Sequence, residues 1–176
     1  MSMLPEGVAA YIGVSTDHEF APEAVETGAV RRFAQAIMDD DPAYWQEGPA
    51  TARHGGPVAP PLFPTAMFRR PFGTPDPFAE QAGNPDYDGA GTIATMGLPE
   101  ILPFRGYNVL AGGSEVEFTR YAKWGERVRV RSSYADIEAK QTSKGMLFLI
   151  HILSEFTTAE GELLMRVRRT SLRRPV

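Results

Sequence analysis

The chain contains no cysteine among its 176 residues. This absence excludes a disulfide framework, a thiolate nucleophile and a cysteine-rich zinc site, and it fits a reducing compartment. Long apolar runs are missing too, since no window approaches the roughly 18 residues that a membrane helix needs. The segment from Met1 to Val8 also lacks the charged stretch and apolar run of an export signal. We therefore expect a cytoplasmic protein without a membrane partner.

Positive charge is not in excess either, because 18 lysine and arginine residues face 22 aspartate and glutamate residues. Binding to nucleic acid usually needs clustered positive charge that neutralises phosphates, so we expect no nucleic-acid partner.

Three consecutive carboxylates, Asp39 to Asp41, form an acidic cluster of a kind that suits hard cations. Three adjacent side chains cannot all point inward, however, and no further ligands recur at calcium-loop spacing. We therefore expect no metal site.

Helical patterns occupy part of the first half of the sequence. Four apolar residues fall at the i, i+3, i+4 and i+7 positions of one helix face: Val30, Phe33, Ala34 and Ile37. Thr27 is a suitable N-cap, and the helix should end near Asp39, because weak helix formers and Pro42 follow. A short buried helix is predicted from Pro61 to Phe72, entered through a proline. The segment 72–97 has the features of a long functional loop.

The last third of the sequence predicts strands, because its apolar residues alternate or form short blocks between turn residues. Four strands are expected: Asn108 to Arg120, Arg127 to Ile137, Met146 to Thr157 and Leu163 to Leu172. The short connectors between them favour antiparallel neighbours in chain order. The sequence therefore predicts one α+β domain over residues 1–176, with a helix lying across a curved antiparallel sheet.

Acid/base residues follow the first predicted helix. Residues 36–44, Ala-Ile-Met-Asp-Asp-Asp-Pro-Ala-Tyr, resemble the motif Gly-Asp-x-Asn-Pro-(aliphatic)-His of the MaoC-like (R)-specific enoyl-CoA hydratases. Asp39 matches the catalytic aspartate of the motif, Asp41 its asparagine and Pro42 its proline. Tyr44 stands at the catalytic histidine, and Met38 at the glycine. Because tyrosine titrates at about 10 rather than near neutrality, Tyr44 is poorly suited to replace the histidine.

The resemblance extends from about Ile12 to Arg174. Five further stretches are similar to the N-terminal-domain type of MaoC dehydratase: Gly28–Ala34, Gly56–Pro61, Gly112–Glu115, Tyr134–Ile137 and Gly161–Leu163. The resemblance implies a hot-dog fold, in which an antiparallel curved β-sheet is wrapped around a central α-helix. Members of this type commonly act beside a second hot-dog subunit, or a fused second half, that holds the intact aspartate and histidine pair.

The resemblance also implies the residues of the site. Asp39 is the candidate catalytic group, together with Tyr44 at the histidine position, and His54 is a candidate displaced base, although a lone loop histidine is more often solvated. In the catalytic relatives the thioester oxygen accepts backbone N–H bonds at the start of the central helix. The matching segment here predicts six substrate-binding residues: Gly55, Gly56, Val58, Ala59, Pro60 and Phe63. Pro60 has no N–H group, which removes one donor from an oxyanion hole.

Three functions remain open. The first is a hydratase or dehydratase subunit that interconverts trans-2-enoyl and (R)-3-hydroxyacyl thioesters, with Asp39 activating water. The second is a non-catalytic, substrate-shaping partner of a catalytic hot-dog hydratase subunit. The third is a hot-dog acyl-CoA thioesterase, which shares the fold but not the motif. In each, an acyl-CoA or acyl-carrier thioester is the substrate without another cofactor, and the chain forms a homodimer or a heterodimer with another hot-dog subunit.

Overall fold

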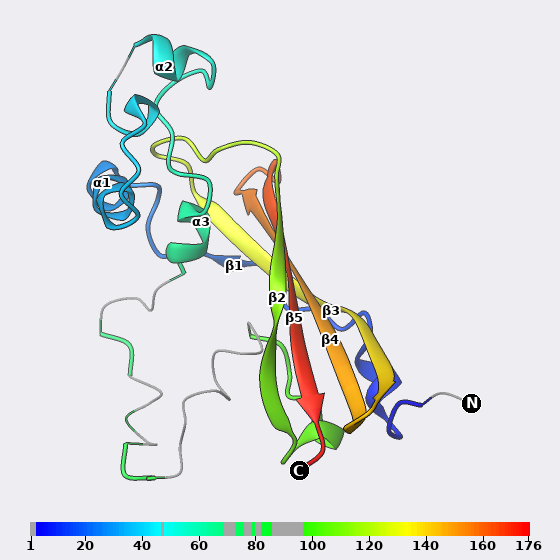
Figure 1. Ribbon diagram of the computed structural model, residues 1–176. Helices are drawn as coiled ribbons and strands as arrows, with labels where there is room; N and C mark the ends of the chain where they lie inside the picture. The colour runs from blue at the N-terminus through cyan, green and yellow to red at the C-terminus, as the bar shows by residue number, and fades with distance from the viewer. Residues whose placement is uncertain (1–2, 47, 69–72, 76–78, 80–81, 86–96) are drawn as a thin grey trace.

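The main feature of the molecule is a five-stranded antiparallel sheet with the order β1-β3-β4-β5-β2 (Figure 1). The computed structural model describes residues 3–46, 48–68, 73–75, 79, 82–85 and 97–176. The strands are β1 (Glu19–Phe20), β2 (Asn108–Phe118), β3 (Val128–Thr142), β4 (Gly145–Thr158) and β5 (Leu163–Arg174). The four long strands lie where the alternation of apolar residues predicted strands, although β3 continues to Thr142 and not only to Ile137. The two-residue β1 is too short to leave such a pattern.

One expectation about the sheet is wrong, because β2 and β3 are not neighbours. β2 pairs with β5 along its length, so the connection from β2 to β3 is a crossover rather than a hairpin. The reason lies in residues 119–127, which are held by another segment. The N–H of Ala59 donates to the carbonyl of Ala122 at 2.8 Å, and an isolated bridge joins Val58 to Lys123. These contacts carry the chain across the end of the sheet.

The helical elements are short. They are η1 (Val8–Tyr11), α1 (Thr27–Ala36), η2 (Pro42–Tyr44), α2 (Pro49–Ala52), α3 (Phe63–Ala66) and η4 (Leu102–Phe104). The N-cap of α1 is the extended residue Glu26 rather than Thr27, and no side chain caps this end. α3 is shorter than the predicted helix, whose end at 69–72 lies outside the described residues, as does most of the loop predicted at 72–97. No helix of the described part is long and apolar enough to cross a membrane.

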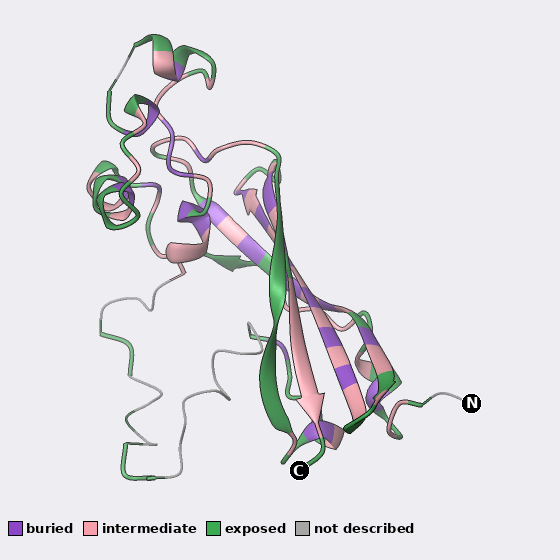
Figure 2. Cartoon of the chain, in the orientation of Figure 1, coloured by how far each residue is buried: buried purple, intermediate pink, exposed green. Residues whose placement is uncertain are grey.

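One face of the sheet carries the core. Buried and partly exposed residues alternate along β3 and β4, so that each strand turns one side to the interior (Figure 2). At one end of the sheet, Val30 from α1 and Phe63 from α3 join a buried cluster with Val128, Phe156 and Met165. This cluster fixes α1, and with it the turn that follows α1, against the sheet.

A second buried cluster covers the other end of the same face. It brings Val8 and Phe104, from the segments around η1 and η4, against Tyr134 and Phe148. Ser132 is also buried on β3, and its hydroxyl forms a hydrogen bond of 2.8 Å with the hydroxyl of Ser154 on β4. This buried polar pair satisfies both hydroxyls across neighbouring strands.

Strand β2 differs from the other long strands, because all of its residues are exposed (Figure 2). It lies at the edge of the sheet, and among the described strands it pairs with β5 alone. Four of its apolar side chains are between 38 and 47 % exposed: Val109, Leu110, Val116 and Phe118. A long edge strand with apolar side chains is a template for pairing with another chain.

Candidate active site

The site begins at the turn that ends α1. The N–H of Asp39 donates to the carbonyl of Ala34 at 3.0 Å, and the N–H of Met38 donates to the carbonyl of Gln35 at 3.2 Å. These two bonds form a Schellman motif, in which the residue at the position of Met38 adopts the left-handed conformation. Met38 has φ 56° and is the one non-glycine residue with a positive φ in the described part of the chain. The turn directs Asp39 toward the segment containing η2.

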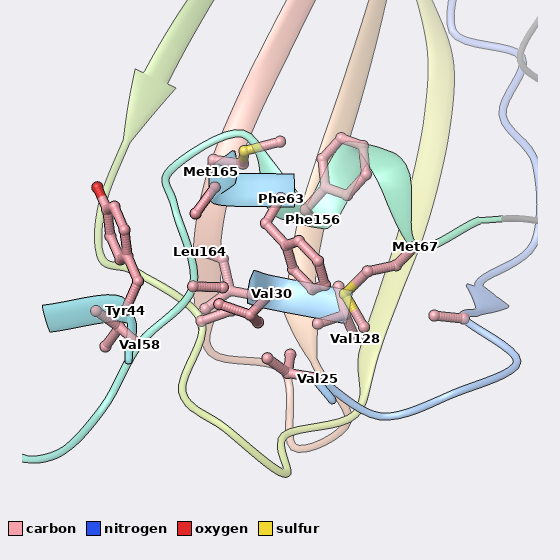
Figure 3. Close-up of a cluster of buried hydrophobic side chains, with 14 of the residues drawn as sticks. Val25, Val30, Tyr44, Val58, Phe63, Met67, Val128, Phe156, Leu164 and Met165 are labelled. Atoms are coloured by element: carbon pink, nitrogen blue, oxygen red, sulfur yellow. The ribbon is translucent and has the colours of Figure 1, made fainter. Parts of the chain in front are cut away.

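Asp39 and Tyr44 are brought together by this turn and η2. The hydroxyl of Tyr44 donates to Oδ2 of Asp39 at 3.1 Å, while Oδ1 accepts the N–H of Asp41 at 3.2 Å. Asp41 caps η2 by accepting the N–H of Ala43 at 2.9 Å. The ring of Tyr44 lies against the core beside Val58, with its hydroxyl pointing away from the buried cluster (Figure 3). The chain thus holds the two candidate catalytic residues in direct contact.

Tyr44 is set up as a hydrogen-bond donor. Burial raises the pKa of its phenol well above the ordinary value, and the charge of Asp39 and the hydrogen bond to it raise this pKa further. Each effect disfavours the phenolate, because the anion would lose hydration and face a carboxylate. Tyr44 therefore keeps its proton at neutral pH and cannot serve as a general base there.

A pocket of about 540 Å³ opens beside this pair. Its lining includes Arg31 and Asp40, the paired Asp39 and Tyr44, and the apolar side chains of Met38 and Trp45. Pockets that bind small molecules have similar volumes and combine apolar walls with a few polar groups. Asp39 therefore borders a concave site.

His54 lies outside the lining of this pocket. Its Nε2 accepts a hydrogen bond of 2.8 Å from Nε of Arg53, and its ring stacks on Tyr121 with 4.9 Å between the ring centroids. Arg53 also forms an ion pair of 2.9 Å with Asp41. His54 is therefore held by Arg53 and Tyr121, and it does not line the pocket that contains Asp39. The candidate role of this histidine as a base has no geometric support in the contacts it makes.

The backbone donors expected for a thioester oxygen are already occupied. The N–H groups of Gly55 and Gly56 donate to the carbonyls of Ala52 and Thr51 in the turn after α2. Two more N–H groups donate outside the turn: Val58 to Ala43 at 3.1 Å and Ala59 to Ala122 at 2.8 Å. A thioester carbonyl would have to displace one of these bonds.

The other two residues expected to bind substrate lie in the interior. Pro60 is fully buried and Phe63 is 4 % exposed. Phe63 contacts Phe33 edge to face, with 5.5 Å between the ring centroids. Both residues therefore belong to the core and do not line the pocket. No group of three or more potential metal ligands occurs within the described residues.

Four residues that line the pocket were not identified as site residues from the sequence: Arg31, Ala34, Gln35 and Trp45. Arg31 and Trp45 lie outside the residues matched to the motif, on either side of the Asp39 turn. Trp45 directly follows η2 and is 55 % exposed. Helical spacing was the available signal for Arg31, since it precedes Gln35 by four residues and shares its side of α1.

Three solved structures place the fold among known proteins. The chain is similar to the ChsH1-ChsH2 complex from Mycobacterium tuberculosis, with 23% identity, coverage of 97% of this chain and 95% of that chain, and a TM-score of 0.70. The truncated HadBC (3R-hydroxyacyl-ACP dehydratase) complex from the same organism gives 18% identity, coverage of 92% and 96%, and a TM-score of 0.55. A MaoC-like dehydratase from Rhodospirillum rubrum gives 18% identity, coverage of 94% of each chain and a TM-score of 0.55.

These likenesses confirm the hot-dog fold with its curved antiparallel sheet. No curated protein sequence matches the chain. The family model of the FAS1-like dehydratase domain region matches residues 10–167, which is most of the chain. This match shows that the chain, which has a hot-dog fold, belongs to the FAS1-like dehydratase domain region family.

Proposed function

We propose that this chain is the substrate-shaping subunit of an acyl-thioester hydratase/dehydratase, and that a second hot-dog subunit supplies the complete acid/base pair. The observation that carries the proposal is the contact between Tyr44 and Asp39. A phenol with a raised pKa donates to the carboxylate at the position where the family motif has its catalytic histidine. The substrate class is trans-2-enoyl thioesters and, in reverse, (R)-3-hydroxyacyl thioesters.

The chemistry explains why this pair is incomplete. Hydration requires one group to take a proton from water as its oxygen attacks C3 and another group to deliver a proton to C2. Asp39 suits the first task, because its carboxylate lines the pocket. Tyr44 does not suit the second, since its pKa is raised and its hydrogen bond is directed at Asp39. The complete aspartate and histidine pair of the partner subunit would therefore carry out both proton transfers, which leaves Asp39 outside the proton-transfer steps.

Stabilisation of the developing oxyanion points in the same direction. In acyl-thioester chemistry, free backbone N–H groups stabilise the negative charge that builds up on the thioester oxygen. Here the N–H groups of Gly55, Gly56, Val58 and Ala59 are bonded to carbonyls of the chain itself. This segment is therefore better suited to form a wall of the substrate site than to stabilise an oxyanion.

The exposed edge strand supports the proposed partner. All residues of β2 are exposed, and no other strand among the described residues pairs with its outer edge, which could receive a further strand. Two of the structurally similar proteins are complexes of different subunits, ChsH1 with ChsH2 and the two components of HadBC. We therefore propose a heteromer with a second hot-dog subunit, joined through β2.

The test compares this chain alone with this chain co-expressed with a candidate partner, a hot-dog subunit that carries the intact aspartate and histidine motif. Hydration of trans-2-butenoyl-CoA and trans-2-decenoyl-CoA is followed for both preparations. We expect turnover only in the co-expressed complex. Asp39→Asn in this chain should lower kcat less than about fivefold, whereas the matching aspartate variant in the partner should abolish turnover.

Three results would contradict the proposal in different ways. Turnover by this chain alone that disappears in Asp39→Asn would make the chain a catalytic hydratase. Release of free CoA from saturated acyl-CoA would indicate a thioesterase. Failure of both acyl-CoA substrates to bind, alone or in the complex, would remove the acyl-thioester ligand itself.

A further inference from the structure

Met38 has a conformation that works against the stability of the chain. It occupies the left-handed position of the Schellman motif after α1, with φ 56°. Glycine is preferred at this position, because a Cβ atom crowds the backbone there. Non-glycine residues in this region are strained, and such strain persists where the side chain serves another purpose.

The side chain of Met38 does nothing for the fold of this chain. It is 91 % exposed, so it buries almost no surface against its own neighbours. It lines the same pocket as Asp39 and Tyr44, and Trp45 follows Tyr44 along the wall, itself 55 % exposed. Two large apolar side chains thus border the carboxylate and phenol while remaining open to solvent. An apolar ligand part would bury them, which is favourable in proportion to the area covered.

We propose that Met38 is a specificity-determining residue, whose side chain forms with Trp45 the apolar wall that receives the hydrocarbon part of an acyl thioester. This inference rests on the proposed function, since it takes the thioester as the ligand of the pocket. The pocket has a volume of about 540 Å³, which lies in the range of sites that bind small molecules. Methionine is unbranched and flexible, so its side chain adapts to chains of different shape.

The test separates backbone strain from apolar contact with three variants of the same residue. Met38→Gly removes both, so we expect the Tm to rise by roughly 2–4 °C while the affinity for decanoyl-CoA falls about tenfold. Met38→Gln keeps the length and the strain but adds a polar amide, so the Tm should stay unchanged while the affinity falls. Met38→Leu should retain both the Tm and the affinity. Binding is measured by isothermal titration calorimetry on the full chain, alone and in the co-expressed complex.

Two controls define the outcome. Affinity for free CoA should change less than about twofold in every variant, because the hydrocarbon part is missing. Leu102→Gln changes an exposed apolar residue in η4, outside the pocket, and should leave decanoyl-CoA binding as it is. Wild-type affinity for decanoyl-CoA in Met38→Gly and Met38→Gln would overturn this inference and leave the proposed function standing. The same holds if these variants bind decanoyl-CoA normally but no longer assemble with the partner. If the wild type binds decanoyl-CoA no better than free CoA, the proposed function fails as well.

Discussion

Arg120 binds Glu126 with both ends of its guanidinium group, with Nη1 3.0 Å from Oε2 and Nη2 2.9 Å from Oε1. The same Nη2 reaches Glu162 at 2.6 Å, so that one arginine joins the β2–β3 crossover to the turn between β4 and β5. The side chain of Arg120 is 22 % exposed. Its role is therefore to hold the end of the sheet together rather than to meet a ligand phosphate.

The first prediction concerns this arginine. Arg120→Ala should lower the free energy of unfolding by about 1–2 kcal/mol, because Glu126 loses a bidentate partner in a partly buried place. Arg105→Ala is the matched control, since Arg105 pairs with Glu100 on the surface, where an ion pair contributes little. Urea unfolding followed by circular dichroism measures both. Equal loss in the two variants would contradict the structural role of Arg120.

A second prediction follows from Tyr134, which is buried on β3 and donates to the carbonyl of Pro99 at 2.8 Å. Burial raises the pKa of Tyr134 to about 12, against a weaker opposing effect of Arg173. The folded chain therefore keeps this proton above pH 10, where the unfolded chain releases it. Stability from this residue is complete below pH 10 and is lost as pH rises toward 12, by roughly 1 kcal/mol at pH 11.

The measurement for Tyr134 is the free energy of unfolding in urea between pH 8 and pH 11. Tyr134→Phe should be less stable than the wild type at pH 8, because the hydrogen bond to Pro99 is lost. The difference between the two proteins should shrink as pH rises, since phenylalanine cannot ionise. A constant difference across this range would contradict the raised pKa.

The third prediction is that Tyr44→His does not make the chain a hydratase on its own. This substitution restores the residue of the family motif beside Asp39, but the four N–H groups from Gly55 to Ala59 remain bonded within the chain. Without donors for the thioester oxygen, the electrostatic part of catalysis is missing. The assay is hydration of trans-2-butenoyl-CoA by the purified variant without a partner. Turnover comparable to the co-expressed complex would show that the histidine alone was lacking.

Much of the fold was predictable from the sequence, because local patterns determine it. Alternation of apolar residues defined the four long strands, and the spacing from Val30 to Ile37 defined α1. The strand order was not predictable in the same way, since the neighbour of β2 depends on long-range bonds such as that between Ala59 and Ala122. β1 is defined by its pairing with β3, and two residues are too few to show a strand pattern in the sequence.

In the candidate site, too, the locally determined features were predictable from the sequence and the tertiary contacts were not. The motif named Asp39 and Tyr44 as candidate catalytic residues, and the structure adds the direct hydrogen bond between them, which the local turn after α1 makes possible. The motif did not predict that the N–H groups of Val58 and Ala59 would be occupied, because their acceptors, Ala43 and Ala122, are far away in the sequence. Tertiary contacts decide whether a backbone N–H is free, and a local sequence motif does not indicate these contacts.

The last prediction tests the edge strand β2. Val116 is 38 % exposed in the single chain and lies opposite Val167 of β5. Val116→Lys should leave the folded chain within about 0.5 kcal/mol of the wild type, because the new side chain remains in water. In the assembly, the same lysine would bring an unpaired charge to the strand edge, so we expect the complex to weaken by tenfold or more, about 1.4 kcal/mol. Leu102→Lys, at an exposed position in η4, is the control and should assemble normally. Sedimentation velocity measures assembly of the complex, and urea unfolding followed by circular dichroism measures the stability of the single chain. Normal assembly of Val116→Lys would show that the partner binds another surface.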